Sequence, residues 1–238
     1  MKIKIIFTLL FLAIFKINYA QQKLTTEDLF KEYLISQNAS IAKSIVASND
    51  NLYSIFCEAD LTNNSEKKIA GFSKFIDLSP KYGLAKAYES RGIAYIYIEK
   101  TDAALADLNK SLQLDPADPY TFYFKGDAYM DLKKLDSAID NFNYAIKLDP
   151  NFSLAYHLRG IAFDDQKKYQ NALDDFTKEI KLDKKSDIAY KMRGFVYNEM
   201  GKYKLAIDDW RKAEKLNPDN YKHLDDFIDK AMSKLRNE

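Results

Sequence analysis

The sequence predicts an all-α protein, a right-handed superhelical solenoid of stacked antiparallel helix pairs, and three observations support this class. Glycines recur every 34 residues, and alanines recur at the same interval, each 12 residues after a glycine. Aromatic residues lie four before and three after each glycine, and a large apolar residue lies four after each alanine. A pattern written four times in register is typical of a repeat architecture. Its defining residues are Gly92, Gly126, Gly160, Gly194, Ala104, Ala138, Ala172 and Ala206.

Each repeat is expected to contain two helices. In the second repeat Phe122, Gly126 and Tyr129 lie at i, i+4 and i+7, which is one face of a helix. Ala138 and Phe142 mark the face of a second helix. Because glycine costs a helix interior about 1 kcal/mol relative to alanine, its recurrence indicates close approach of a neighbouring backbone. Asp-Pro or Asn-Pro pairs follow the second helix in three repeats, where proline ends a helix.

Residues Ala85 to Asn220 resemble the tetratricopeptide repeat, whose length and order of aromatic, glycine, alanine, aromatic and proline they reproduce. The resemblance implies four repeats, at 85–118, 119–152, 153–186 and 187–220. Glu179 departs from the pattern, since alanine is usual there. Basic residues also precede each glycine where leucine is usual, and we expect their stems to be buried over the neighbouring turn. These are Arg91, Lys125, Arg159 and Arg193.

The flanking segments are predicted to be helical as well. Residues 21–84 are read as N-terminal helices that include a degenerate repeat, because 69–80 align without gaps on 139–150. The first helix of that degenerate repeat is expected from Asn51 to Leu61. Residues 221–238 are predicted to form a capping helix that closes the solenoid, since its apolar residues fall on one face. That face carries Leu224, Phe227, Ile228, Ala231 and Leu235.

Residues 1–20 have the order of a secretory signal peptide. Lys2 and Lys4 precede an apolar or hydroxyl run from Ile5 to Phe15, and the small residue Ala20 precedes the expected cut. The alternative is a membrane anchor, but the run is shorter than the ~20 residues that a bilayer core demands. We therefore expect cleavage near Ala20 and a periplasmic or secreted protein, with no membrane span after processing.

Charge and cysteine content narrow the function further. Removal of residues 1–20 takes away three lysines and no acid, so the net charge changes from +1 to −2. A near-neutral balance argues against a nucleic-acid partner and against an electrostatic membrane anchor. Cys57 is the single cysteine, which leaves a buried thiol or an intermolecular disulfide. Its neighbours Ile55 and Phe56 favour burial.

The resemblance also implies a binding surface. In the family that these repeats resemble, a concave groove is lined chiefly by first-helix residues at fixed offsets from the glycine. The alternative for each position is a solvated inner surface without a partner. The candidate partner-binding residues are Lys86, Glu89, Tyr97, Tyr120, Tyr123, Asp127, Asp131, His157, Asp164, Asp165, Lys191, Asn198 and Glu199.

Acids and tyrosines dominate this set, which favours a protein or peptide partner with basic and apolar anchors. Several tetratricopeptide proteins grip an acidic carboxyl-terminal tail with lysine, asparagine and arginine. The corresponding positions here, among them Glu89, Ile93 and Tyr120, do not supply that set.

No pattern predicts catalysis, a cofactor or a metal. His157 and His223 are the two histidines, and no H-E-x-x-H, cysteine pair or glycine-rich phosphate loop occurs. His157 with Asp164 is the less favoured metal or enzyme alternative. The pairs Asp174-Asp175 and Asp208-Asp209 are expected to be solvent-facing charge. The sequence thus predicts a non-catalytic protein-protein interaction module of the cell envelope, with a structural scaffold or self-assembling component of an envelope complex as the alternative.

Overall fold

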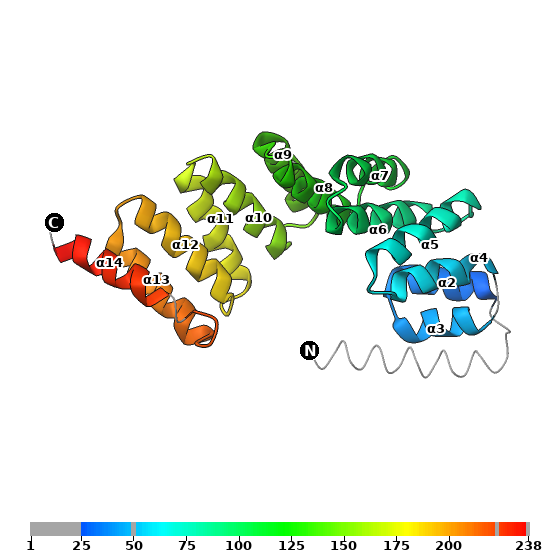
Figure 1. Cartoon of the computed structure of the whole chain (residues 1–238), viewed down its shortest axis with the longest axis horizontal. Coiled ribbons are helices and arrows are strands. Elements are labelled where there is room, and N and C mark those ends of the chain that lie inside the picture. Colours follow the sequence, from blue (N-terminus) through cyan, green and yellow to red (C-terminus); the bar gives the residue numbers. More distant parts are fainter. Residues whose placement is uncertain (1–24, 49–50, 222–223, 237–238) are drawn as a thin grey trace. The chain divides into compact units, whose positions relative to one another are not determined.

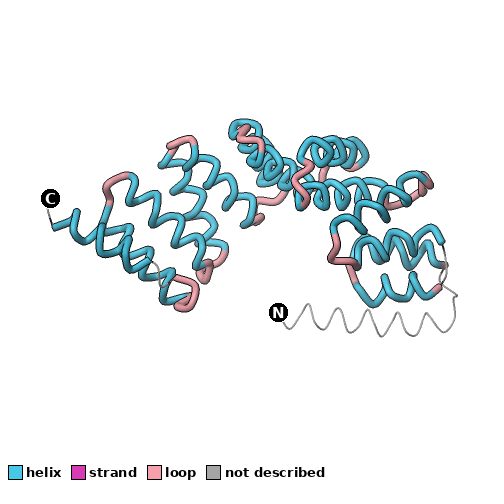
Figure 2. Tube along the Cα trace, viewed as in Figure 1, coloured by secondary structure: helices cyan, strands magenta, loops and turns pink. Residues whose placement is uncertain are grey.

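The computed structural model describes residues 25–48, 51–221 and 224–236 as thirteen α-helices without a strand (Figures 1 and 2). The chain divides into two compact units, the described residues up to Ile98 and those from Glu99 onward. The first unit holds α2(Thr26–Ser36), α3(Ala39–Ala47), α4(Asn51–Leu61), α5(Ser65–Asp77) and α6(Leu84–Tyr97). The second holds α7(Thr101–Leu114), α8(Pro119–Asp131), α9(Leu135–Leu148), α10(Ser153–Asp165), α11(Tyr169–Leu182), α12(Asp187–Glu199), α13(Tyr203–Leu216) and α14(Asp225–Arg236).

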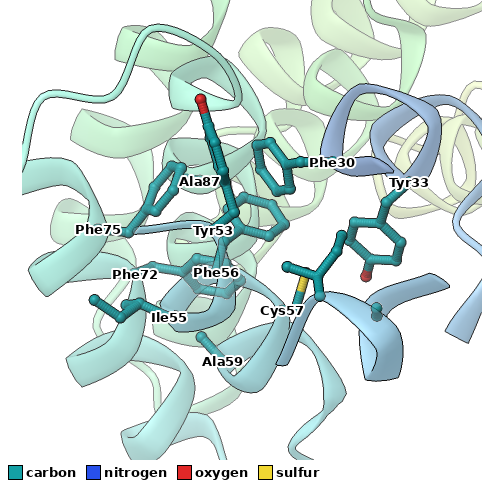
Figure 3. Packing of buried hydrophobic residues seen from close by; sticks show 12 residues of the cluster. Phe30, Tyr33, Tyr53, Ile55, Phe56, Cys57, Ala59, Phe72, Phe75 and Ala87 are labelled. Atoms are coloured by element: carbon teal, nitrogen blue, oxygen red, sulfur yellow. The ribbon is translucent and has the colours of Figure 1, made fainter. Parts of the chain in front are cut away.

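The first unit is organised around Phe56, on α4. Its ring centroid lies 5.1 Å from that of Phe30, 5.1 Å from that of Phe72 and 5.0 Å from that of Phe75, all with edge-on geometry. Figure 3 shows these rings gathered from α2, α4 and α5. Edge-to-face contacts of this kind add to the apolar burial of large aromatic side chains. Helix α4 has the bounds that the sequence predicts for the first helix of the degenerate repeat.

Cys57 lies in the same cluster and is fully buried (Figure 3). The thiol is free. Burial, together with the nearby Asp60 and Glu58 carboxylates, raises the pKa of Cys57 to about 12. Since the thiolate is the nucleophile, this thiol is an inert core group rather than a reactive one. Of the two alternatives that the sequence leaves open, the structure supports burial.

In the second unit each helix packs against the next one along the chain, from α7 to α14. Local sequence explains where the helices begin and end. Asp118 caps α8 by accepting a hydrogen bond from the Tyr120 amide at 3.0 Å, and Pro119 occupies the first turn. Second helices start after short turns in which Lys133, Lys167 and Gly201 have positive φ. These turns reverse the chain between the two helices of a repeat.

The recurrent glycines allow an aromatic side chain to lie on the first helix. A Cβ added to Gly126 would lie 2.5 Å from Phe142 Cε1, and one on Gly160 would lie 2.8 Å from Phe176 Cε1. The same atom on Gly194 would lie 2.6 Å from Trp210 Cδ1. The sequence predicts close approach of a neighbouring backbone, with small residues facing large ones across the helix pair. At these glycines the nearest group is the large ring of the second helix, and at Gly194 the Ala206 carbonyl oxygen also lies close, 3.2 Å from the added Cβ. A methyl group has no room beside that ring.

Helix α14 covers the last repeat. Leu224, Ile228 and Ala231 are buried in one cluster with Trp210. In Figure 1, α12, α13 and α14 follow one another, and α13 contacts both neighbours. The apolar face predicted for this helix is therefore used in packing, although Phe227 and Leu235 keep about two fifths of their surface exposed.

Candidate functional site

The candidate residues fall into two separate sets. Lys86, Glu89 and Tyr97 belong to α6 in the first unit, and the other ten belong to α8, α10 and α12 in the second. In the second unit two rows of side chains recur on these three first helices, one residue from each helix. The apolar row is Tyr120, Leu154 and Ile188, with 53, 55 and 41% of the residue surface exposed. The acidic row is Asp131, Asp165 and Glu199, all exposed.

The two rows lie at opposite ends of the same helices. Each acidic-row residue is the last residue of its helix, and each apolar-row residue lies in the first turn. The two lie eleven positions apart on each helix, which corresponds to about 16 Å along the helix axis. The surface between them carries Asp127 on α8 and Asp164 on α10. We call this surface, with both rows, the first-helix face.

The acids of the first-helix face are placed where negative charge is unfavourable. A helix C-terminus carries partial negative charge, so an acid there is destabilising and a lysine or arginine is preferred. None of the three last turns contains a basic residue. Burial and the Asp131 charge raise the pKa of Asp127, and burial with the charges of Asp165 and Glu199 raises the pKa of Asp164. The acids repel one another. Within the described residues, no ion pair joins an acid of the acidic row to a lysine or arginine.

His157 is not a free groove residue, because it forms part of an internal hydrogen-bond cluster. Its Nδ1 lies 2.8 Å from Glu179 Oε2, and the Ser186 hydroxyl donates to Glu179 Oε1 at 2.8 Å. Glu179 is buried, so both contacts offset the cost of desolvating its carboxylate. Ser186 also accepts a hydrogen bond from the Ala189 amide and thereby caps α12. The three residues serve the packing of α10, α11 and α12.

The same three positions hold matched side chains in the neighbouring repeats. In the second repeat they are Tyr123, Ala145 and Phe152, where the Tyr123 and Phe152 rings lie 5.2 Å apart. In the fourth repeat the first position is Lys191, whose Nζ lies 5.2 Å from the ring centroid of Tyr221. Glu179 replaces the usual alanine only where a histidine and a serine can satisfy it. The departure noted in the sequence is therefore compensated locally.

Two of the arginines that precede the glycines, Arg159 and Arg193, make buried ion pairs. Arg159 donates from Nε and Nη2 to Asp175, at 2.8 and 2.6 Å, and from Nη1 to Asn143 Oδ1 at 2.5 Å. Arg193 does the same to Asp209, and its Nη1 donates to Thr177 at 3.1 Å. Each arginine thus joins two successive second helices. We call this the arginine ladder, and its members are Arg159, Arg193, Asp175, Asp209, Asn143 and Thr177.

The arginine ladder corrects the prediction that both acids of each pair face solvent. Asp174 and Asp208 are exposed, whereas Asp175 and Asp209 are buried. Burial raises the pKa of Asp175 even though Arg159 opposes that change. The expectation that the arginine stems are buried is confirmed for Arg159 and Arg193, whose side chains are 18 and 16% exposed. The 16-residue spacing between each arginine and its acid was the available signal.

The first-unit candidates differ from those of the second unit. Lys86 Nζ lies 2.5 Å from Glu89 Oε2, and Glu89 is buried. Tyr97, in contrast, is 75% exposed. Both Lys86 and Tyr97 line a pocket that belongs wholly to the first unit. Glu89 therefore holds Lys86 in place rather than presenting its own charge to a partner.

The described residues give no sign of a metal centre or a membrane span. Within residues 25–48, 51–221 and 224–236, no three histidine, cysteine or acidic side chains lie close enough together to hold a metal ion. No helix in these ranges combines the length and apolar character that crossing a bilayer demands. Residues 1–20, where the signal peptide is predicted, lie outside the described residues.

Comparison with known proteins identifies the repeats. Family models described as tetratricopeptide repeat match residues 85–118 and 188–220, and one described as TPR repeat matches residues 126–167. The matched ranges coincide with consecutive helix pairs of an all-helical repeat protein. These ranges lie within the repeats that the sequence predicts or overlap them. No curated protein gives a significant match to the chain.

Solved structures share the fold at low sequence identity. The structure titled "Crystal structure of MamA protein" has a TM-score of 0.62 and 22% identity, covering 69% of this chain and 89% of its own. The structure of MamA residues 41 to the end from Desulfovibrio magneticus RS-1 has a TM-score of 0.62 and 18% identity, covering 76% of this chain and 96% of its own. These likenesses establish a solenoid of consecutively packed helix pairs.

Proposed function

We propose that this protein is a non-catalytic binding module whose first-helix face docks a protein or peptide carrying basic and apolar side chains. The fold is typical of interaction modules, and helix-pair solenoids expose extended surfaces of this kind. The observation that carries the proposal is the acidic row. Three successive helices end in an acid at a position where a helix disfavours one.

The chemistry of the partner follows from the two rows. Asp131, Asp165 and Glu199 would meet lysine or arginine, and the apolar row would meet apolar anchors. The Tyr120 ring offers flat contact area, and a cation over its face would add to the attraction. Because exposed charges are screened by salt, the affinity should fall as ionic strength rises.

A charge-neutralising variant tests the proposal. The acidic-row variant is Asp131→Asn with Asp165→Asn and Glu199→Gln. The matched control is Asp140→Asn with Asp174→Asn and Asp208→Asn, which removes the same charge from exposed, equivalent positions of the second helices of the same repeats. Crosslinking in the native cell identifies what the wild type holds, and the affinity of each variant for the purified partner is then measured.

The expected result is a loss of about tenfold or more in affinity for the acidic-row variant and little change for the control. The acidic-row variant should be at least as stable as the wild type, since each removed acid relieves about 0.3–1 kcal/mol of unfavourable interaction with its helix. A partner held equally by all three proteins would contradict docking on the first-helix face.

We also propose that the protein is exported to a periplasmic or extracellular compartment after cleavage near Ala20. Support comes from the order of residues 1–20, with lysines, an apolar run and a small residue before the cut. N-terminal sequencing of the protein isolated from its native cell tests this. The expected first residue is Gln21, and a chain that still begins at Met1 would overturn the proposal.

A further inference from the structure

The first unit contains a pocket of about 600 Å³ that the proposed function does not use. One wall is the face of α6 from Lys86 to Tyr97, and the other is the end of α4 with the first turn of α5. Gln37, which follows α2, completes the lining. A volume of this size lies in the range of pockets that hold small molecules.

The polar lining of the pocket combines two lysines with the Asp60 carboxylate, and with amide and hydroxyl side chains. Lys68 Nζ donates to the Asp60 carbonyl oxygen at 2.9 Å and lies 3.9 Å from Asp60 Oδ1. The Asp60 carboxylate also accepts a hydrogen bond, at Oδ2, from the buried Tyr33 hydroxyl. Lys86 is held by Glu89. Two ammonium groups are thus fixed at the pocket, and each retains N–H groups that can donate to a ligand.

Ser90 adds a hydroxyl group to the pocket. It lies on α6 between Lys86 and Ala94, lines the pocket and is 8% exposed. Its hydroxyl makes no hydrogen bond to any described residue. The oxygen itself remains accessible to solvent, so a ligand oxygen in the pocket could accept its hydrogen bond in place of water. Ser65, at the first position of α5, adds a hydroxyl beside the positive end of that helix.

The remaining wall is apolar. Ile93 and Ala94 line the pocket from α6, and Tyr97 stands at the end of this helix with most of its ring exposed. Binding pockets commonly pair an apolar lining with a few polar groups that fix the orientation of the ligand. Donors gathered around Lys68, Ser65 and Ser90 suit the oxygens of an anion, and Ile93 with Tyr97 suits an apolar body.

We propose that this pocket binds an organic carboxylate with an apolar or aromatic body. The carboxylate accepts hydrogen bonds from Lys68 and Ser90, and the apolar body lies against Ile93, Ala94 and the Tyr97 ring. Charge-assisted hydrogen bonds to a carboxylate are the stronger ones available to such a site. The site is independent of the acidic row, which lies in the other unit.

Calorimetric titration of the full chain with phenylpropionate tests the pocket, and phenylpropionamide is the neutral counterpart. The variants are Lys68→Met, which removes the ammonium and keeps the stem, and Ser90→Leu, which fills the pocket. Ser90→Ala serves if the larger residue prevents folding. Lys67→Met is the matched control, because Lys67 is the exposed neighbour of Lys68 on α5. A short peptide ending in phenylalanine is titrated as well, once with a free and once with an amidated C-terminus. This comparison tells whether the carboxylate of the ligand belongs to a polypeptide end or to a free organic acid.

Saturable binding of phenylpropionate is expected, with the amide weaker by about tenfold or more. Lys68→Met and Ser90→Leu should lose a similar factor, and Lys67→Met should bind like the wild type. Stronger binding of the free-terminus peptide than of phenylpropionate would support the site and assign the carboxylate to a polypeptide end. Absence of saturable binding by either acid, equal binding of acid and amide, or unchanged affinity in both pocket variants would overturn the proposal.

Discussion

The Arg193 guanidinium donates from Nε and Nη2 to the two carboxylate oxygens of Asp209, at 2.7 and 2.8 Å. Arg193 lies on α12 and Asp209 on α13, so this fork joins the two helices of one repeat. Its third contact, to Thr177, reaches α11 of the preceding repeat. The hydrogen bond to Asp209 raises the pKa of Arg193 further, which keeps the pair charged. A single side chain therefore fixes both the pairing and the stacking of helices.

Removal of Arg193 should be costly. Arg193→Ala leaves the buried Asp209 carboxylate without its guanidinium, and we expect a loss of about 3–5 kcal/mol in the free energy of unfolding, measured by urea titration. Asp208→Ala, at the exposed neighbour, should change stability by less than about 0.5 kcal/mol. Arg193→Leu with Asp209→Leu should recover much of the loss, because no charge is left buried. A cost below about 1 kcal/mol for Arg193→Ala would show that the fork is not structural.

The cluster around Glu179 is tested by replacing its three residues with those at the equivalent positions of the second repeat. His157→Ala alone should destabilise the protein by about 1–3 kcal/mol, since a buried carboxylate loses one of its two partners. The triple variant His157→Tyr, Glu179→Ala and Ser186→Phe installs the side chains of the second repeat and should cost less than His157→Ala in urea unfolding. If the triple variant is the less stable of the two, the three positions are not interchangeable as a unit.

Trp210 should tolerate replacement by phenylalanine. The indole Nε1 is buried and finds no hydrogen-bond partner among the described residues, and such a donor costs about 1–3 kcal/mol. Phe142 and Phe176 occupy the equivalent positions of the second and third repeats. Trp210→Phe should therefore cost less than about 1 kcal/mol in chemical denaturation, because relief of the unpaired N–H offsets the lost volume. Trp210→Ala should cost about 3–5 kcal/mol. Equal losses for the two variants would contradict this reasoning.

The pH dependence of stability should reveal how much the partly buried carboxylates of the first-helix face destabilise the folded chain. The folded-state pKa values of Asp127 and Asp164 are raised, so the folded chain binds more protons than the unfolded chain between about pH 4 and the raised values. Their unfavourable contribution is therefore fully present at neutral pH and disappears as the pH falls toward about 4.

The double variant Asp127→Asn with Asp164→Asn measures this contribution. It should melt above the wild type at pH 7, and the difference in melting temperature should shrink as the pH is lowered. Asp140→Asn with Asp174→Asn, at exposed positions of the second helices, is the control and should show no such trend. A difference that grows on acidification would reverse the sign derived for these two groups.

Much of the fold was predictable because the same pattern of packing residues recurs in each repeat of the sequence. The spacing of Gly126, Ala138 and Phe142 predicts two helices and their facing sides, since glycine and a large ring occupy complementary positions. The apolar spacing of Leu224, Ile228 and Ala231 likewise predicts a helix buried on one side. These inferences need only helical periodicity, which is a local property of the chain.

The candidate site was predictable to a lesser degree. The fixed offsets of the repeat place Asp131, Asp165 and Glu199 on first helices, and the structure adds that each one ends its helix. His157 is a binding candidate by its offset from Gly160, whereas its partners Glu179 and Ser186 come from α11 and the start of α12. A hydrogen bond between helices depends on the depth and rotation of each one, which no local pattern specifies.

By itself the sequence determined the class, the repeat length, the faces of the helices and the kinds of side chain on the first-helix face. Only the tertiary structure decided which polar residues are internal: Asp175 is buried against Arg159, while its neighbour Asp174 is exposed. The pocket beside Ser90 was likewise invisible in the sequence, because its walls come from α4, α5 and α6. Periodicity follows from backbone geometry along one helix, whereas burial of a charge depends on what a second helix brings to it.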